Sequence, residues 1–272
     1  MSGLTLSLKE APRQRVDLSA LTSAIMDGKT AKEIAGLKLT LGNRKCSLGD
    51  IFKVTGRPGS RLVIDNCTDK IDGIGARWSD GSVIVQGNAG AYLGKGMTGG
   101  NIHVYGNAGA YVASAMGDGH IHIEGDAGDF IGAPQAGIRV GMNGGVVRVE
   151  GNAGDRVGDQ MRRGVILIEG NVGSHCASRM IAGSLAVLGD AGPNLGLGMR
   201  RGTVLLMKPP SHLPATFNDC GSHALPFFHL FLSYIESLAE GNQTIDPSRD
   251  RLHRYAGDLA VDGKGEILFY NY

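Results

Sequence analysis

Short runs of alternating apolar and polar residues return every 19 residues through the middle of the chain. Each run starts at a glycine, and its third and fifth positions are apolar in every copy. Alternation with a period of two, carried mostly by β-branched residues, predicts a short strand whose third and fifth side chains face inward. The starting glycines are Gly81, Gly100, Gly119, Gly145, Gly164, Gly183 and Gly202; the third positions hold Val83, Ile102, Ile121, Val147, Ile166, Leu185 and Val204; the fifth positions hold Val85, Val104, Ile123, Val149, Ile168, Val187 and Leu206.

Turn residues follow each run, as in Gly87-Asn-Ala-Gly90, and glycine and asparagine adopt positive φ angles at low cost. A second short segment then ends at a recurring methionine, a residue that fills irregular gaps in a core. A fixed period this short, with one strand and one turn in each copy, predicts a solenoid. The methionine column is Met97, Met116, Met142, Met161, Met180 and Met199.

Nineteen residues do not hold a helix and a strand together, so the repeat predicts an all-β fold. We expect a single-stranded, right-handed parallel β-helix, with the hand taken from the general crossover preference. Stacked copies would also place Asn88, Asn107, Asn152 and Asn171 above one another as a ladder of side-chain amides.

The chain is expected to divide into an N-terminal cap at residues 1–36, the β-helix at residues 37–208 and a C-terminal cap at residues 209–272. Residues 37–43 and 59–66 look like degenerate first coils, because an open β-helix needs atypical end coils that prevent edge pairing.

Both caps are expected to contain short helices. Residues 17–35 predict two of them, the first capped by Asp17 or Ser19 and the second by the capping-box pattern from Thr30 to Glu33. The C-terminal cap predicts one amphipathic helix over residues 227–240 and a last strand over residues 265–270.

The third copy is seven residues longer than the others, with the extra residues around Ala133–Arg139. An insertion in a solenoid is extruded as a loop on one side. Two interpretations stay open at this stage, a simple bulge or a contact with a partner.

The fourth and sixth positions of each copy point away from the core. Apolar residues at the two ends of this outward face indicate either a partner or a cover from the chain's own caps. His103 and His122 stack one coil apart, and surface histidines are the favoured interpretation, since no third ligand for a metal is evident. Glu124, Glu150 and Glu169 form an acidic ladder that should be solvated or met by a basic partner. The apolar members are Ile84, Leu167, Ala186, Leu188, Leu205 and Met207.

A basic stripe is predicted on another corner. Arg162-Arg163 and Arg200-Arg201 occupy the same two positions two coils apart, about 10 Å from each other, and Arg179 lies in the coil between them. The stripe is either a solvated rim or a site where guanidinium groups hold a carboxylate- or phosphate-rich chain.

Composition narrows the picture further. A net charge of +1 gives no overall attraction to nucleic acid or membranes, and no apolar run is long enough to span a bilayer. Neither a signal peptide nor a CxxC pair is found, so we expect a cytoplasmic protein whose four cysteines are free, buried thiols. No nucleophile with its base, phosphate loop or dinucleotide fingerprint occurs, since the frequent GxG pieces come from the repeat.

The repeated Gly-Asn/Asp-Ala-Gly unit with its Gly-Met ending resembles the GXGXG domain, over about residues 37–207. That domain forms the C-terminal β-helix of the glutamate synthase large subunit and the body of the C subunit of formylmethanofuran dehydrogenase. The likeness to this C subunit, above all in the formyltransferase/hydrolase complex of methylotrophic bacteria, extends through the N-terminal helices and Gly257–Leu268. Glutamate synthase fits less well, because no Cys follows Met1 and 272 residues leave no room for its flavin and iron–sulfur domains.

The resemblance implies a scaffold subunit that joins subunits A, B and D and binds no cofactor by itself. Such a complex moves a formyl group from formyl-tetrahydromethanopterin to a methanofuran analogue and hydrolyses it to formate, completing formaldehyde oxidation. The transferase and hydrolase centres, with their metal, belong to other subunits. The stripe of Arg162, Arg163, Arg179, Arg200 and Arg201 would then contact the glutamate-rich tail of methanofuran. The C subunit of an archaeal-type formylmethanofuran dehydrogenase is the alternative within the family.

A second hypothesis is an independent β-helix enzyme with its site on the solenoid face. Adjacent-coil carboxylates would supply its acid and base, and Glu124 and Glu150 are the candidates. A pH–rate profile abolished by Glu150→Gln would favour it.

Overall fold

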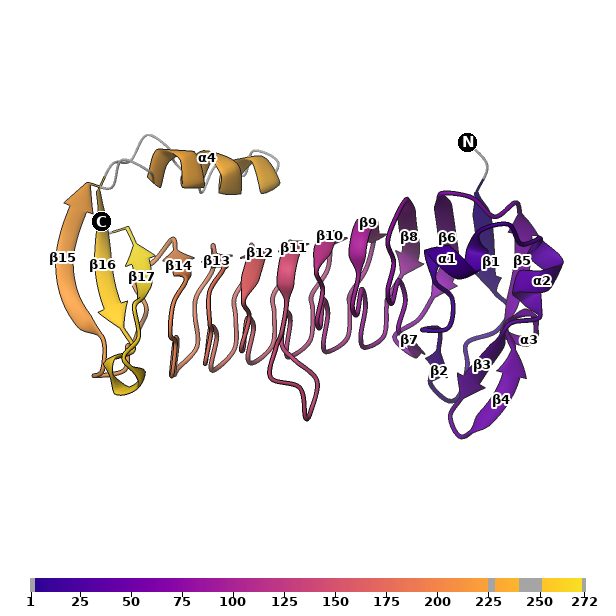
Figure 1. Cartoon of the computed structure of the whole chain (residues 1–272), viewed down its shortest axis with the longest axis horizontal. Coiled ribbons are helices and arrows are strands. Elements are labelled where there is room, and N and C mark those ends of the chain that lie inside the picture. The colour runs from indigo at the N-terminus through magenta and orange to yellow at the C-terminus, as the bar shows by residue number, and fades with distance from the viewer. Residues whose placement is uncertain (1–2, 225–227, 240–250, 271–272) are drawn as a thin grey trace.

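The computed structural model describes residues 3–224, 228–239 and 251–270 of the chain, and their strands form two sheets. The larger, mostly parallel sheet has the strand order β15-β16-β17-β14-β13-β12-β11-β10-β9-β8-β6-β1-β5, and it runs the length of the molecule (Figure 1). The smaller sheet, β4-β3-β2-β7, lies at the N-terminal end. The expectation of a mostly β protein built around one parallel stack is therefore confirmed.

The repeat supplies the central strands of the large sheet. Neighbouring strands are parallel and in register, so that Val83 pairs with Ile102, which pairs with Ile121. The same register continues to Val204, and the third and fifth columns are buried throughout, as predicted. These strands are β8 (Ser82–Gly87), β9 (Thr98–Val104), β10 (Asp118–Ile123), β11 (Asn143–Val149), β12 (Arg163–Ile168), β13 (Ser184–Val187) and β14 (Thr203–Leu206).

Each coil returns through a second, thinner line of contacts. Single parallel bridges join Ala89 to Ala108 and continue coil by coil to Ala191. The segment after each bridge alternates between ordinary and left-handed backbone, as at Tyr92, Gly94 and Gly96, and it ends at the methionine column. Every methionine of that column is fully buried, which confirms its predicted place in the core.

The starting glycines are required by their backbone. All of them have positive φ, from 76° at Gly81 to 107° at Gly183, a conformation that L side chains adopt at a cost of roughly 1–2 kcal/mol. At Gly81 a Cβ atom would also lie 2.0 Å from the carbonyl oxygen of Ser60 in the coil before it. The glycine is therefore fixed by the conformation and by the close approach of the neighbouring coil.

The asparagine ladder exists in a different form from the one predicted. The Oδ1 atom of Asn88 accepts a hydrogen bond of 2.9 Å from the backbone N–H of Asn107, and the pattern repeats up to the N–H of Asp190. Asp126 takes the same role between Asn107 and Asn152, because the bond needs a side-chain oxygen and a backbone donor. The turns are therefore linked by hydrogen bonds from backbone N–H groups to side-chain oxygens and not by amide–amide bonds. Aspartate can replace asparagine because it offers the same acceptor oxygen.

The N-terminal strands extend the stack. β6 (Arg61–Cys67) pairs in parallel with β8, which confirms the degenerate coil expected at residues 59–66. β1 (Leu4–Leu8) adds a further parallel strand to β6, and β5 (Phe52–Gly56) closes that end in antiparallel orientation. The strands thus carry the large sheet into the segment expected to be a separate cap, and the limits of the caps stay a prediction.

The prediction of a degenerate coil at residues 37–43 is wrong. β3 (Lys38–Leu41) pairs with β4 (Arg44–Ser47) as an antiparallel hairpin across Gly42-Asn43. In the true coils Gly-Asn precedes Ala-Gly, whereas here the chain turns back at once, with Gly42 at φ 57°. β2 (Val16–Asp17) and β7 (Ile71–Asp72) complete the small sheet.

Two short helices lie where the N-terminal sequence predicts them. α1 (Ser23–Met26) is capped by Thr22, so the expected caps at Asp17 and Ser19 are wrong, and Asp17 belongs to β2. α2 (Ala31–Ala35) has the predicted capping box between Thr30 and Glu33. A third short helix, α3 (Leu48–Ile51), follows the hairpin.

The C-terminal residues complete the sheet and cover part of it. β17 (Gly265–Phe269) lies parallel to β14, which confirms the predicted last strand, and β16 (Arg251–Gly257) and β15 (Asn218–Ala224) follow in antiparallel orientation. The turn η1 (Leu259–Val261) joins β16 to β17. Helix α4 (Phe228–Leu238) confirms the predicted amphipathic helix, whose expected ends at residues 227 and 240 lie outside the described residues.

Helix α4 lies along the outward side of the last coils (Figure 1). Its buried residues form one cluster with the outward apolar residues of β12–β14. The apolar C-terminal end of the outward face is therefore covered by the chain's own cap. The cluster contains Phe228, Leu232 and Ile235 of the helix, Ala239 just after it, and the outward residues Leu167, Ala186, Leu188, Leu205 and Met207 of the coils.

Candidate functional site

Outward side chains of neighbouring coils pair with each other next to the end of α4. His103 Nε2 lies 2.9 Å from Glu124 Oε1 in the next coil, and His122 Nε2 lies 2.8 Å from Glu150 Oε1. The two imidazole rings stack with centroids 4.6 Å apart, and Tyr105 stacks on His103 at 4.3 Å. The parallel register produces this arrangement, because a fourth position lies diagonally beside the sixth position of the following coil.

Arg148 continues the pairing toward the C-terminus. Its guanidinium lies 3.2 Å from Glu150 and 2.8 Å from Glu169. The Arg148 and Glu169 side chains are only 10% and 13% exposed. Each carboxylate of the acidic ladder therefore faces a histidine or an arginine of this same chain.

The two candidate acid–base carboxylates each lie beside a histidine. Glu124 and Glu150 are each 37% exposed, and each faces a histidine of the coil before it. They differ in Arg148, which lies 3.2 Å from Glu150. Among the described residues, no group of three or more His, Cys, Asp or Glu side chains is placed to hold a metal ion.

We expect Arg148→Met to lower the free energy of unfolding by about 3 kcal/mol, because it leaves the largely buried Glu169 carboxylate without this cation. Urea denaturation measures the loss. The double variant Arg148→Met/Glu169→Leu should recover most of it, since neither charge is then buried. A single variant within about 0.5 kcal/mol of the wild type would contradict the expectation.

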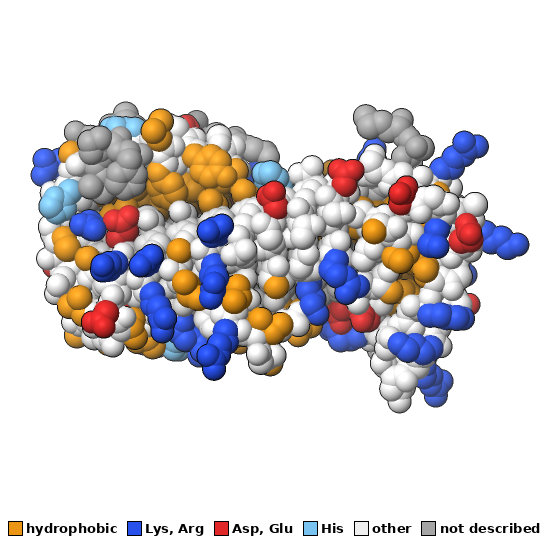
Figure 2. All heavy atoms as spheres, viewed as in Figure 1, with side chains coloured by type: hydrophobic (Ala, Val, Ile, Leu, Met, Phe, Trp, Pro, Cys, Tyr) orange, Lys and Arg blue, Asp and Glu red, His pale blue; other side chains and the backbone are white. Residues whose placement is uncertain are grey.

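The predicted arginine stripe is exposed along its length, but its members differ. Arg179 donates from Nε to Oδ1 of the buried Asp159 at 2.9 Å and from Nη2 to Oδ2, and this bonding raises the pKa of Arg179. Its charge is therefore met within the chain. Arg162, Arg163, Arg200 and Arg201 make no ion pair with another described residue. Figure 2 shows Lys and Arg side chains gathered below α4, over the last coils.

Lys264 extends the stripe by one coil. Its backbone N–H donates to the carbonyl of Arg200 at 2.7 Å, and the pairing of Thr203 with Glu266 places Lys264 beside Arg201. Lys264 is also exposed. The repeat gives no signal for it, because Lys264 lies in the C-terminal cap and reaches the stripe through the pairing of β17 with β14.

The seven-residue insertion leaves the stack as a loop before β11, as Figure 1 shows at the lower edge. Ile138 in this loop is 48% exposed and Arg139 beside it is exposed. The predicted loop is confirmed in position, and a partner contact there stays a prediction.

The cysteines are free thiols, as expected, but only part of them are buried. Cys67 and Cys176 lie in the core, and burial raises the pKa of each thiol to about 12. Cys46 and Cys220 are partly exposed. Neither buried thiol is suited to nucleophilic chemistry, because the thiolate is the reactive form.

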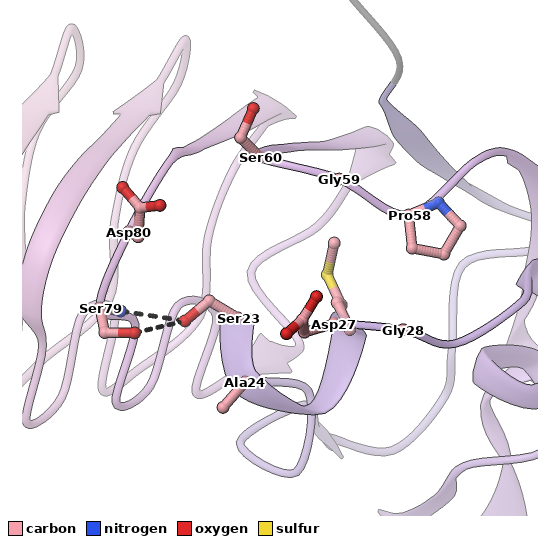
Figure 3. Close-up of a pocket in the computed structure, with 10 residues that line it drawn as sticks. Ser23, Ala24, Asp27, Gly28, Pro58, Gly59, Ser60, Ser79 and Asp80 are labelled. Atoms are coloured by element: carbon pink, nitrogen blue, oxygen red, sulfur yellow. Dashed lines mark hydrogen bonds between the residues drawn. The ribbon is translucent and has the colours of Figure 1, made fainter.

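A polar cleft of about 380 Å³ lies between α1 and the loops that precede β6 and β8 (Figure 3). The hydroxyls of Ser23 and Ser79 lie 2.8 Å apart, and the N–H of Ser79 donates to Ser23 Oγ at 3.1 Å. Asp27 also lines the cleft, next to Gly28 (Figure 3). The serines bond to each other, and the lining holds no His, Cys or Lys, so the cleft offers no activated nucleophile.

No helix in the described part of the chain is long and apolar enough to cross a membrane.

Comparisons with known proteins match the repeat and then the whole chain. The GXGXG motif family matches residues 82–221, just over half of the chain. The C subunit of the formyltransferase/hydrolase complex Fhc of Methylorubrum extorquens is 46% identical over 97% of this chain and 98% of its own length. The C subunit of the tungsten-containing formylmethanofuran dehydrogenase 2 of Methanothermobacter wolfeii is 34% identical over 35% of this chain, an alignment that spans 37% of that relative.

A solved structure shows the same fold over the same length. It is the formyltransferase/hydrolase complex (FhcABCD) of Methylorubrum extorquens in complex with methylofuran. The matching chain has a TM-score of 0.89 and 38% identity, and the match covers 98% of this chain and all of that one.

Proposed function

Because the chain belongs to the C-subunit family of formyltransferase/hydrolase complexes, we propose that it is the structural C subunit of such a complex. The observation that carries this proposal is the 46% identity over nearly the full length of both chains. The described surface agrees with it, because the acidic ladder is internally paired and the serines of the polar cleft bond to each other.

The complex would join this chain to subunits A, B and D and use a methanofuran analogue as carrier. Formyl transfer from tetrahydromethanopterin, hydrolysis to formate and the metal that serves it would belong to the other subunits. The chain itself would supply a rigid stack that holds them at fixed distances, in the cytoplasm. We also propose that the stack winds as a single-stranded, right-handed parallel β-helix, supported by the general preference of parallel crossovers for that hand.

The arginine stripe would contact the glutamate-rich tail of the carrier. Methylofuran accompanies the related complex, and a tail of repeated carboxylates suits repeated guanidinium groups. Arg162, Arg163, Arg200 and Arg201 are exposed, and Lys264 continues their row. A linear row of cations at coil spacing suits an extended anionic chain better than a compact anion.

The C subunit of an archaeal-type formylmethanofuran dehydrogenase is the weaker alternative, since alignments with those proteins span about a third of the chain. An independent enzyme is weaker still, because the similarity to the C subunit of the formyltransferase/hydrolase complex covers nearly the whole chain.

Co-purification of the tagged chain from its natural cells, followed by mass spectrometry, tests the proposal. Subunits A, B and D should elute with it in fixed proportion. The purified chain alone should not hydrolyse formyl-methanofuran, and hydrolysis by the chain alone would reject the scaffold assignment.

A further inference from the structure

A buried carboxylate lies beneath two partly exposed arginines. The Asp159 side chain is only 3% exposed, whereas those of Arg156 and Arg179 are 35% and 56% exposed. Arg179 donates from Nε to Asp159 Oδ1 at 2.9 Å and from Nη2 to Oδ2, and Ser178 Oγ donates to the same Oδ1 at 3.2 Å. Arg156 Nη1 lies 3.9 Å from Oδ2, which is too far for a hydrogen bond. Two guanidinium groups therefore share one carboxylate.

This sharing leaves positive charge in excess. Asp159 neutralises Arg179, and Arg156 has no hydrogen bond or closer ion pair with another described residue. The neighbouring carboxylate of Asp155 accepts the backbone N–H of Ser174 at 2.7 Å and makes no ion pair with either arginine in the described structure. An anion that reaches the two guanidinium groups is therefore attracted to them.

The geometry of Arg179 also leaves room for a second carboxylate. A guanidinium group is a planar fork of N–H donors, and Asp159 occupies only the edge formed by Nε and Nη2. The edge formed by Nη1 and Nη2 stays available on a side chain that is more than half exposed. Because Asp159 fixes the plane of the fork, a carboxylate that arrives from outside meets donors that are already oriented.

The coil itself does not require a carboxylate at position 159. In every coil the N–H of this residue donates to the carbonyl three residues before it, whatever the side chain. A buried charge is unfavourable unless it is paired, and apolar side chains often pack equally well in its place. Asp159 is therefore explained by the guanidinium that it holds. The equivalent residues of the other coils are Lys95, Ser114, Ala133, Ser178 and Leu197.

The two arginines border the arginine stripe. Arg162 of the stripe follows Asp159 by three residues. On the other side, Gly198 lies two residues before Arg200, and a Cβ atom at Gly198 would meet the Cγ atom of Arg179 at 3.4 Å. Since Gly198 has no side chain, that position leaves Arg179 uncovered. An anionic chain that follows the stripe therefore lies next to this pair of guanidinium groups.

We infer that Arg156 and Arg179 form a carboxylate-binding site in which Asp159 is a positioning residue. The bound carboxylate accepts hydrogen bonds from the free edge of Arg179 and from Arg156. Its source is the polyanionic carrier tail or an acidic side chain of another subunit, and both offer the same chemistry. The first source rests on the proposed function, whereas the site itself does not.

The site is tested on the isolated full chain with a fluorescein-labelled oligoglutamate peptide, by fluorescence anisotropy at low ionic strength. Arg156→Gln and Arg179→Lys should each weaken binding about 3- to 10-fold. Arg179→Lys keeps the charge and a partner for Asp159 but lacks the second edge. Arg57→Gln, at the exposed far end, loses the same charge as Arg156→Gln and should leave the affinity unchanged. Arg156→Gln should also keep the thermal midpoint, since Asp159 retains its hydrogen bonds.

Peptide affinity that is unchanged in both arginine variants would overturn the inference, and so would an equal loss in Arg57→Gln. A lower thermal midpoint of Arg179→Lys with unchanged peptide affinity would show that the ion pair only joins two coils.

The source of the carboxylate follows from the complex, with each variant co-expressed with subunits A, B and D. Carrier lost from the Arg156→Gln and Arg179→Lys complexes, but kept with Arg57→Gln, assigns the site to the carrier tail. Unchanged carrier content with weaker subunit association assigns it to an acidic side chain of another subunit. If the wild type did not assemble with A, B and D, the proposed function would fail, while the peptide assay would still decide the site.

Discussion

Gly81→Ala should cost at least about 4 kcal/mol of unfolding free energy and leave most of the chain unfolded at 37 °C. The new Cβ would lie 2.0 Å from the carbonyl oxygen of Ser60, 2.8 Å from its carbonyl carbon and 2.9 Å from its Cα. All three are backbone atoms of the neighbouring coil, which no rotamer change can move aside. Relief requires the coils to separate, and this breaks the β6–β8 pairing and the packing beneath it. Urea denaturation followed by circular dichroism measures the loss.

Gly28→Ala is the matched control. Gly28 has nearly the same left-handed backbone, φ 69° against 76°, but a Cβ there would meet nothing within 4 Å. Its cost should therefore be limited to the backbone conformation, about 1 kcal/mol. Equal losses in the two variants would show that φ alone fixes the starting glycine and that contact between coils does not.

Charge reversal of the stripe should remove the carrier from the assembled complex. Replacing Arg162, Arg163, Arg200 and Arg201 with Glu turns four exposed cations toward a polyanion into four repelling charges. Exposed pairs each contribute roughly 0.5–1 kcal/mol, so loss of four weakens binding by about 30- to 1000-fold at low salt. The carrier content of the purified complex and the salt dependence of carrier affinity both measure this.

The same substitutions at the far end of the molecule provide the control. Arg13, Arg44, Arg57 and Arg61 are also exposed, and their replacement by Glu changes the net charge equally. This variant should keep its carrier if the position of the charges matters. Unchanged carrier content in the stripe variant would reject the contact, and equal loss in both variants would reduce it to a general charge effect.

The repeat could be predicted in detail because the same residue types recur at equivalent positions of each coil. Alternation fixed the inward columns, and the structure has Val83, Ile102 and Ile121 in one buried register. Methionines at equal spacing had to share one place in every coil. The starting glycines indicate a backbone with positive φ, which other residues avoid. Each of these signals lies within a single coil.

Errors arose where a local pattern occurred in a different context. The pair Gly42-Asn43 looks like a coil turn but joins a hairpin, because the residues after it pair back at once with the strand before it. The sequence predicts a ladder of side-chain amides, whereas the donors are backbone N–H groups of the next coil. In both cases the structure depends on which groups pair through hydrogen bonds, and the local sequence does not specify those pairs.

The sequence by itself determined the coil, its core columns, its insertion and the arginine doublets, because a 19-residue period places equivalent residues above one another without knowledge of anything else. Only the tertiary structure decided that α4 covers the outward apolar end and leaves Leu230 exposed, that His103 and Arg148 pair with the acidic ladder, and that Lys264 joins the stripe. The physical reason is that some of these contacts join the repeat to segments that lie outside it, and others join side chains that are diagonal neighbours in adjacent coils. Both kinds form only once the coils are stacked and the C-terminal strand β17 has paired with β14.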